Sequence, residues 1–277
     1  MTVINKYPKQ KNKTNKEFFE RKDKELTNLD WAKWAGWFDT DGSFVKQKRK
    51  TKQGYQLFVS LKLTDKQPVE IFSDMFETSL CYQEGDTTTP NGVKYVCKMF
   101  WAVLSSDKAT WFTENVSPYL TKKEKQEYAG KILEDTVRSK NFNTWTKDEA
   151  THYLATVIEG DGCIKIQNPA GSNTKSISIT IVSNNTQYLA NLVSIAASKL
   201  NVHSKFRKTK TYQTKKGTKT MYALYILCSR RNPENLDFLK SLLKYKVMTL
   251  DRKKEKIQEF VTWIDTQKEK PRLESRV

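Results

Sequence analysis

The chain has 277 residues, enough for one large domain or two compact ones, and 37% of them are apolar, so a hydrophobic core can form. Its 49 basic and 31 acidic residues give a net charge of +18, which favours a polyanionic partner, nucleic acid before an anionic membrane. No run approaches the roughly 20 apolar residues of a membrane span. The Lys-rich N-terminus does not have the pattern of a secretory signal, and four scattered cysteines with two histidines disfavour a structural zinc site.

The predicted elements repeat once along the chain. Residues 1–26 are predicted to be a charged, loosely ordered tail. From residue 27 to residue 138, the first lobe is predicted to contain, in order, a helix ending near residue 41, strands at 44–50 and 55–64, a helix with apolar Val69, Phe72, Met75 and Phe76, strands near 81–86 and 93–104, and helices near 107–116 and 121–138.

The second half has the same order of elements. Residues 139–145 are polar and are predicted to be the linker, residues 146–267 the second lobe, and residues 268–277 a C-terminal tail. Within the second lobe we expect a helix ending near residue 161, strands at 163–167 and 175–182, a helix near 185–200, strands near 203–212 and 218–228, and helices near 233–243 and 249–267. The expected fold class is α+β, with two pseudo-symmetric αββαββα lobes.

One motif is duplicated at the start of each lobe. Residues 31–44 read WAKWAGWFDTDGSF and residues 151–164 read THYLATVIEGDGCI, so each copy has an acid, a small residue, Asp and Gly, followed by the start of a strand-like segment. A T-x-x-[DE] capping box, at Thr27 and at Thr146, precedes each copy and predicts where its helix begins. Gly42 and Gly162 are expected as left-handed C-terminal caps.

The two aspartates of the motif, Asp41 and Asp161, are expected at helix C-termini. An acid there is disfavoured by a few tenths to about 1 kcal/mol, because the helix macrodipole is negative at that end. A divalent cation reverses this penalty, and hard cations prefer oxygen ligands. The carbonyls of Thr40 and Gly160 are further candidate ligands.

Other interpretations of these residues stay open. A single Asp-Gly pair is most often a simple turn, and it is the second copy that favours a metal site. The small residues of the two motif helices favour close packing of one helix on the other, with ordinary core packing inside each lobe as the alternative. For Asp39 and Glu159, a positioning or lobe-contact role and a surface role are equally compatible with the sequence.

These residues resemble the LAGLIDADG motif, and the chain resembles a monomeric, two-motif LAGLIDADG homing endonuclease over residues 27–267. The nine motif positions fall on residues 34–42 and 154–162. The resemblance implies that Asp41 and Asp161 are the catalytic, metal-binding acids, and that Thr40 and Gly160 offer carbonyls to the metal. Trp34, Trp37 and Thr156 depart from the usual motif residues, which affects the helix interface and leaves the acids intact.

The resemblance implies further residues near the chemistry. A basic residue before the last helix of each lobe falls on Lys123 and Lys246, with surface lysine as the alternative. A polar position at the end of the second strand falls on Asp65 and Asn184, at the periphery of the active site, and Asp65 departs from the amide that is common there. The implied cofactor is Mg²⁺, for which Ca²⁺ or Mn²⁺ can substitute in binding.

The strands carry the candidate DNA-binding residues. A two-stranded ribbon fits the major groove, where Gln and Arg read base edges and Lys more often neutralises phosphate. The alternative is that lysines blunt the sheet edges. Together the two sheets are expected to form a DNA-binding saddle, whose candidate contacts are Lys46, Gln47, Lys48, Arg49, Lys50, Lys62, Lys94, Lys98, Lys165, Gln167, Lys175, Lys205, Arg207, Lys208, Lys210 and Lys219.

The function expected from the resemblance is site-specific, metal-dependent cleavage of double-stranded DNA at a long asymmetric target by a monomer. The alternatives are an RNA maturase that binds intron RNA, and a DNA-binding regulator that does not cleave. Lysine in excess over arginine hints at an A/T-rich coding sequence. We therefore expect an intron-encoded or free-standing frame in an organelle, a mitochondrion or chloroplast, or in phage or bacterial cytoplasm. A membrane partner is not expected.

Overall fold

A computed structural model describes residues 2–4, 15–49, 53–88, 94–137, 140–168, 174–214 and 217–268. Its contacts divide the chain into two compact units, residues 1–160 and residues 161–277. Among the described residues, no helix is long and apolar enough to cross a lipid bilayer.

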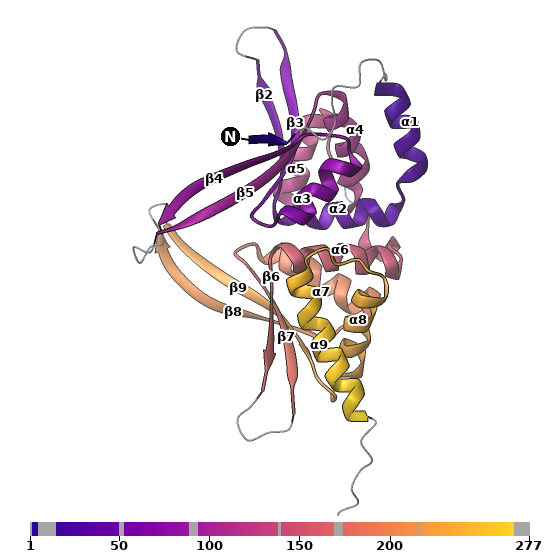
Figure 1. The fold of residues 1–277 in the computed structure, drawn as a ribbon, viewed down its shortest axis with the longest axis vertical. Coiled ribbons are helices and arrows are strands. Elements are labelled where there is room, and N and C mark those ends of the chain that lie inside the picture. The colour runs from indigo at the N-terminus through magenta and orange to yellow at the C-terminus, as the bar shows by residue number, and fades with distance from the viewer. Residues whose placement is uncertain are drawn as a thin grey trace, which may run out of the picture. The chain divides into compact units, whose positions relative to one another are not determined.

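The first unit is a five-stranded antiparallel sheet with helices on one side (Figure 1). Its strand order is β1-β4-β5-β3-β2. The elements are β1 (Thr2–Ile4), α1 (Asn15–Glu25), α2 (Asn28–Thr40), β2 (Gly42–Lys48), β3 (Tyr55–Leu63), α3 (Lys66–Met75), β4 (Leu80–Thr88), β5 (Lys94–Ser105), α4 (Asp107–Val116), the short 3-10 helix η1 (Ser117–Tyr119), α5 (Lys123–Leu133), the 3-10 helix η2 (Phe142–Thr144) and α6 (Lys147–Gly160).

The second unit is a four-stranded antiparallel sheet in the order β6-β7-β9-β8, with three helices on one side (Figure 1). The elements are β6 (Gly162–Gln167), β7 (Ser176–Ser183), α7 (Thr186–Leu200), β8 (Ser204–Thr214), β9 (Gly217–Cys228), α8 (Pro233–Lys244) and α9 (Asp251–Lys268). The predicted α+β fold with a duplicated order of elements is confirmed.

Apolar and polar side chains alternate along the strands, so each sheet has one face covered by helices and one face without helices, here called the open face. In β7, Ile177, Ile179 and Ile181 are buried, whereas the residues between them are partly exposed. Because successive side chains point to opposite faces, the isoleucines all face the helices. In the first unit, Val59 and Leu61 of β3 are buried in the same way.

The two motif helices begin at the predicted capping boxes. The Asp30 carboxylate accepts the Thr27 backbone N–H at 2.9 Å. At α6 the Glu149 carboxylate accepts the Thr146 N–H at 2.6 Å, and the Thr146 hydroxyl accepts the Glu149 N–H at 3.1 Å. Each box satisfies backbone donors that a helix start leaves without intrahelical partners.

The N-terminal segment differs from the predicted loose tail. Helix α1 buries Phe18 against Trp111 of α4, with ring centroids 5.7 Å apart, and the Trp111 indole N–H donates to Asp23 at 2.9 Å. Strand β1 pairs with β4. The segment was missed because α1 has only two apolar residues, both phenylalanine, among charged ones. Residues 269–277, the remainder of the predicted C-terminal tail, lie outside the described residues.

The predicted linker also differs. Residues 142–144 form η2, and Trp145 is buried between Tyr119 and Tyr153, with ring centroids at 5.5 and 5.2 Å. The division between the compact units falls after Gly160, because helix α6 packs on α2 of the first unit.

Helices α2 and α6 pack closely through glycine–threonine pairs at matching motif positions. A Cβ atom on Gly36 would lie 2.0 Å from the Thr156 hydroxyl, and one on Gly160 would lie 2.3 Å from the Thr40 hydroxyl. The Thr156 hydroxyl donates to the Lys33 carbonyl across the interface at 2.9 Å. Thr156, which replaces the usual motif glycine, thus fills the space that Gly36 leaves open.

Neither Gly42 nor Gly162 is a left-handed cap, contrary to expectation. The glycines with positive φ among the described residues are Gly54 and Gly217. At position 42 a Cβ atom would lie 2.3 Å from the Phe38 ring and 2.6 Å from the Phe38 Cα. Glycine is therefore required there by close approach of the strand to the helix.

We expect Gly36→Ala to destabilise the protein by about 1–3 kcal/mol, because the added methyl group overlaps Thr156 and the Tyr153 carbonyl. Urea denaturation measures the change. Adding Thr156→Gly should recover part of the loss, since the two positions share one space.

The matched control is Gly85→Ala in β4, where an added Cβ atom meets nothing within 4 Å. It should change the free energy of unfolding by less than about 0.5 kcal/mol. Equal effects at positions 36 and 85 would contradict the packing interpretation.

Candidate functional site

Each motif aspartate lies between a motif helix and a strand at the edge of its sheet, β2 after Asp41 and β6 after Asp161. Asp41 caps the C-terminus of α2, where its N–H donates to the Trp37 carbonyl at 2.8 Å, and its side chain is exposed. Asp161 follows the last residue of α6, precedes β6 and is also exposed. The predicted position of both acids at helix ends is therefore found, and both are open to solvent.

The preceding motif acid, Asp39, has a structural role. Its side chain is buried and accepts the backbone N–H groups of Thr121 at 2.8 Å and of Lys122 at 3.2 Å, just before α5. The Tyr153 hydroxyl of α6 donates to the same carboxylate at 2.6 Å. Burial raises the pKa of Asp39, and these hydrogen bonds oppose the shift. Asp39 thus joins α2, α6 and the start of α5.

Glu159 is buried as well, so a surface role is excluded for both Asp39 and Glu159. Within the first unit, the charge of Glu159 acts on Lys33 of α2 and raises the Lys33 pKa, against a larger lowering by burial.

A lysine contacts the glycine after each motif aspartate; Lys125 is partly buried and Lys253 is buried. The Lys125 ammonium group of α5 donates to the Gly42 carbonyl in the first unit. The Lys253 ammonium group of α9 donates to the Gly162 carbonyl at 2.7 Å in the second. Lys253 is only 6% exposed. The two lysines therefore have matching places in the duplicated fold.

The surroundings of Lys125 shift the pKa of its ammonium group. Its pKa is lowered, first by burial and then by the neighbouring Lys122 charge, while Asp39 and Asp41 act in the opposite direction. The Lys122 ammonium group donates to the Asp39 carbonyl at 2.9 Å. Positive charge is thus concentrated beside the end of α2.

The lysines expected from the sequence lie elsewhere. Lys123 has a side chain 80% exposed and lies 4.0 Å from Glu127 on the outer side of α5. Lys246 is exposed in the turn after α8, with a φ of 50°. The structure thus brings neither of them to the glycine carbonyls, where Lys125 and Lys253 lie.

The two polar positions predicted at the strand ends, Asp65 and Asn184, lie near the starts of α3 and α7. Asp65 is the N-cap residue of α3, and its counterpart at α7 is Asn185, whose side chain accepts the Tyr188 N–H at 2.9 Å. Asn184, the residue chosen from the sequence, is exposed one position earlier.

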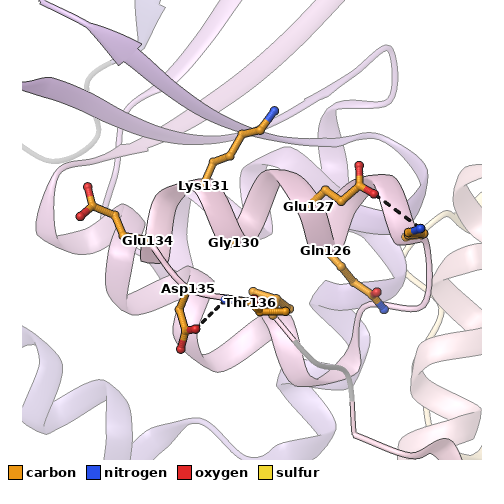
Figure 2. A pocket seen from close by; sticks show the side chains of 9 residues that line it. Gln126, Glu127, Gly130, Lys131, Glu134, Asp135 and Thr136 are labelled. Carbon is orange, nitrogen blue, oxygen red and sulfur yellow. Dashed lines mark hydrogen bonds and ion pairs between the residues drawn. The ribbon is translucent and has the colours of Figure 1, made fainter.

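Two hollows lie along α5. One, of about 730 Å³, has Glu127, Lys131 and Glu134 on its wall and is shown in Figure 2; it contains no motif acid, so it does not mark the candidate chemistry. The other, of about 550 Å³, lies between β2 and α5. Its wall includes Gly42 and the lysines Lys46, Lys125 and Lys131.

The open face of the second sheet is basic. Cross-strand pairing places Cys163, Thr180, Tyr225 and Lys205 in one row across all four strands. A groove of about 680 Å³ follows this face, and its wall includes Lys165, Gln167, Lys205 and Arg207. Lys210 and Lys219 extend the same face toward the β8–β9 turn.

The open face of the first sheet is mostly neutral. Gln47 is opposite Gln56, and the Lys62 ammonium group lies over the Trp101 ring at 5.6 Å. Val45 is also on this face, 38% exposed.

Several candidate DNA contacts do not lie on an open face. Lys46 pairs with Glu134, the C-cap residue of α5, at 2.5 Å. Lys175 lies 3.8 Å from Glu259 of α9. Strand alternation puts three more on the helix side, Lys48, Lys98 and Lys208. Arg49 is exposed just after β2, while Lys50 and the side chain of Lys94 lie outside the described residues.

No protein-family model matches the sequence, and no curated protein matches it. The solved structure of the LAGLIDADG homing endonuclease I-GzeII in complex with its DNA target is similar, with a TM-score of 0.51 and 13% sequence identity. The alignment covers 88% of this chain and 92% of that chain. The chain has the LAGLIDADG homing-endonuclease fold.

Two further solved structures have TM-scores below 0.5. A mutant of I-SmaMI gives 0.49 at 14% identity, covering 88% of this chain and 93% of that one. The homing endonuclease I-WcaI bound to its DNA recognition sequence gives 0.43 at 14% identity, covering 90% and 95%.

We expect Tyr153→Phe to destabilise this LAGLIDADG fold by about 1–3 kcal/mol, because it removes a donor from the buried Asp39 carboxylate. Guanidinium chloride denaturation measures the change. Tyr55→Phe is the control, since that tyrosine is 54% exposed and should lose almost nothing. An unchanged midpoint for Tyr153→Phe would show that Asp39 does not depend on this bond.

Proposed function

We propose that this chain is a site-specific DNA endonuclease that cuts both strands of a duplex with Mg²⁺, acting as a monomer. The observation that carries the proposal is a matching trio in each unit. A solvent-exposed aspartate follows a motif helix, a glycine starts the strand after it, and a partly or fully buried lysine donates to the glycine carbonyl. The fold shared with I-GzeII supports this reading.

The side chains at the helix ends fit a hard divalent cation. Among the described residues there is no cluster of three or more His, Cys, Asp or Glu side chains, so a soft or fully protein-coordinated metal does not fit. Mg²⁺ keeps several waters and usually takes one or two carboxylates together with substrate phosphates. Asp41 with the Thr40 carbonyl, and Asp161 with the Gly160 carbonyl, would hold it. Ca²⁺ or Mn²⁺ could substitute in binding.

A bound divalent cation polarises the phosphate and lowers the pKa of a bound water. The residues of the chain supply position and charge. Lys125 and Lys253 fix the carbonyl of the glycine that follows each aspartate, and their ammonium groups add positive charge where negative charge develops on the phosphate. The lysine-lined hollow between β2 and α5 offers a further cationic wall for a backbone phosphate beside Asp41.

The sheets are suited to a long duplex target. Strand β8 has 11 residues and would span roughly 36 Å at about 3.3 Å per residue, close to one turn of B-DNA at about 34–36 Å. A two-stranded ribbon fits the major groove. Because the open face of one sheet is mostly neutral and that of the other is basic, the two halves of the target should differ in sequence.

Asp41→Asn and Asp161→Asn should each keep DNA affinity within about threefold and abolish conversion of a supercoiled target plasmid to linear DNA. Loss of a metal-binding carboxylate removes several kcal/mol of stabilisation, so double-strand cutting should slow more than about a hundredfold. The plasmid would carry a sequence selected from randomised duplexes by the parent protein.

Asp74→Asn, an exposed acid of α3, is the matched control and should cut normally. Full linearisation by either motif variant in Mg²⁺ would reject the assignment of Asp41 and Asp161.

Lys125→Met and Lys253→Met should each slow cleavage at least about tenfold, because misplacing a catalytic group by about 1 Å can cost a hundredfold. Strand-specific end labels would show whether each variant slows one strand more than the other.

Lys123→Met removes the same charge from the exposed side of α5 and should cut at the parent rate. If Lys123→Met and Lys125→Met were equally slow, the effect would be one of net charge and not of the lysine–glycine contact.

A further inference from the structure

A β-bulge interrupts the β8–β9 ribbon of the second unit. Before it, Arg207 pairs with Ala223 and Lys208 with Tyr222; after it, Lys210 pairs with Met221. Thr209 is the extra residue, and its hydroxyl donates to the Met221 carbonyl at 3.0 Å. Such an insertion changes which residues of the bulged strand face each side of the sheet.

The bulge puts Lys210 on the open face. Under regular alternation, Lys208 and Lys210 would share one face, because they are two residues apart. Instead Lys210 is opposite Met221, which regular β9 alternation places on the same face as Tyr225. Lys208 is opposite Tyr222, which stacks on Phe206 at 5.4 Å on the other face.

Side-chain contacts agree with this assignment. The Tyr212 hydroxyl donates to the Met221 sulfur at 3.7 Å, so both lie on the open face. The Lys210 ammonium group lies 5.7 Å from the centroid of the Tyr212 ring. On the opposite face, the Thr211 and Thr220 hydroxyls are 3.2 Å apart. Lys210 and Tyr212 therefore continue the row of Lys205 and Arg207.

The corresponding ribbon of the first unit has no such irregularity in its described pairing. Strands β4 and β5 pair continuously from Leu80 with Ala102 to Thr88 with Lys94. The bulge is thus a specific feature of the second unit.

We propose that the bulge makes Lys210 a specificity-determining residue, which contacts the major-groove edge of a guanine, with Tyr212 as its positioning residue. Lysine pairs with the O6 and N7 acceptors of guanine, and the aromatic ring beside the ammonium group restricts where it can point. This inference rests on the proposed function, because it assumes that the open face of the second sheet binds duplex DNA.

The test is selection of bound duplexes from a randomised pool by the full chain and its variants. The parent should prefer guanine at one position of the target. Lys210→Ala should lower that preference about tenfold and leave the preferences at the other positions unchanged. Lys210→Gln should shift that position toward adenine, since glutamine pairs with adenine N6 and N7. Tyr212→Ala should weaken the same preference for guanine. Tyr212→Phe, which keeps the aromatic ring, should have the parental preference.

Lys208→Ala is the matched control, because it loses the same charge two residues away on the other face. It should leave the preference at every position unchanged. Identical profiles for Lys208→Ala and Lys210→Ala, or a parental profile for Lys210→Ala, would overturn the inference while leaving the proposed function intact. A parent protein that selects no sequence at all would overturn both.

Discussion

The candidate site depends on how closely helices α2 and α6 approach each other. At two matching motif positions one helix carries glycine and the other threonine, so neither a clash nor a void arises: Gly36 with Thr156, and Thr40 with Gly160. Two threonines at either position would force the helices apart, whereas two glycines would lose contact, and at the Gly36–Thr156 position also the hydroxyl bond to Lys33. The pairing at Thr40 and Gly160 fixes the last residue of each helix, and the motif aspartates are the next residues along the chain.

From this interface the buried polar contacts extend to the helices that carry the lysines. Asp39, next to the interface, accepts backbone donors from Thr121 and Lys122 and so acts as a cap for α5 supplied by α2. Because α5 is fixed in this way, Lys125 reaches the Gly42 carbonyl. A buried carboxylate and a partly buried ammonium group are each costly alone, but each is here hydrogen-bonded to backbone, which makes their geometry specific.

The sequence predicted most elements because their signals are local. Capping boxes and period-two alternation need only neighbouring residues, and the fold confirmed nearly all of the predicted helices and strands. The two lysines that contact the motif glycines could not be found in this way. Lys125 lies 83 residues after Gly42, whereas Lys253 lies 91 residues after Gly162. The spacing between corresponding residues of the two halves therefore changes before the last helix of each half, so the position of one lysine does not predict that of the other. The bulge at Thr209 was invisible for a related reason, because strict alternation assigns Lys208 and Lys210 to one face.

The duplication also explains why the two open faces can differ. In a symmetric dimer both sheets would carry the same side chains, and the preferred duplex would be a palindrome. Here the two halves are joined in one chain, so each sheet is free to change by itself: one face carries Gln47, Gln56 and Val45, the other Lys165, Lys205 and Arg207. Each lysine or arginine that neutralises a phosphate adds to the salt dependence of binding. Under the proposed function, the salt-sensitive part of DNA affinity would therefore reside mainly in the second unit, while the first would contribute contacts that change little with ionic strength.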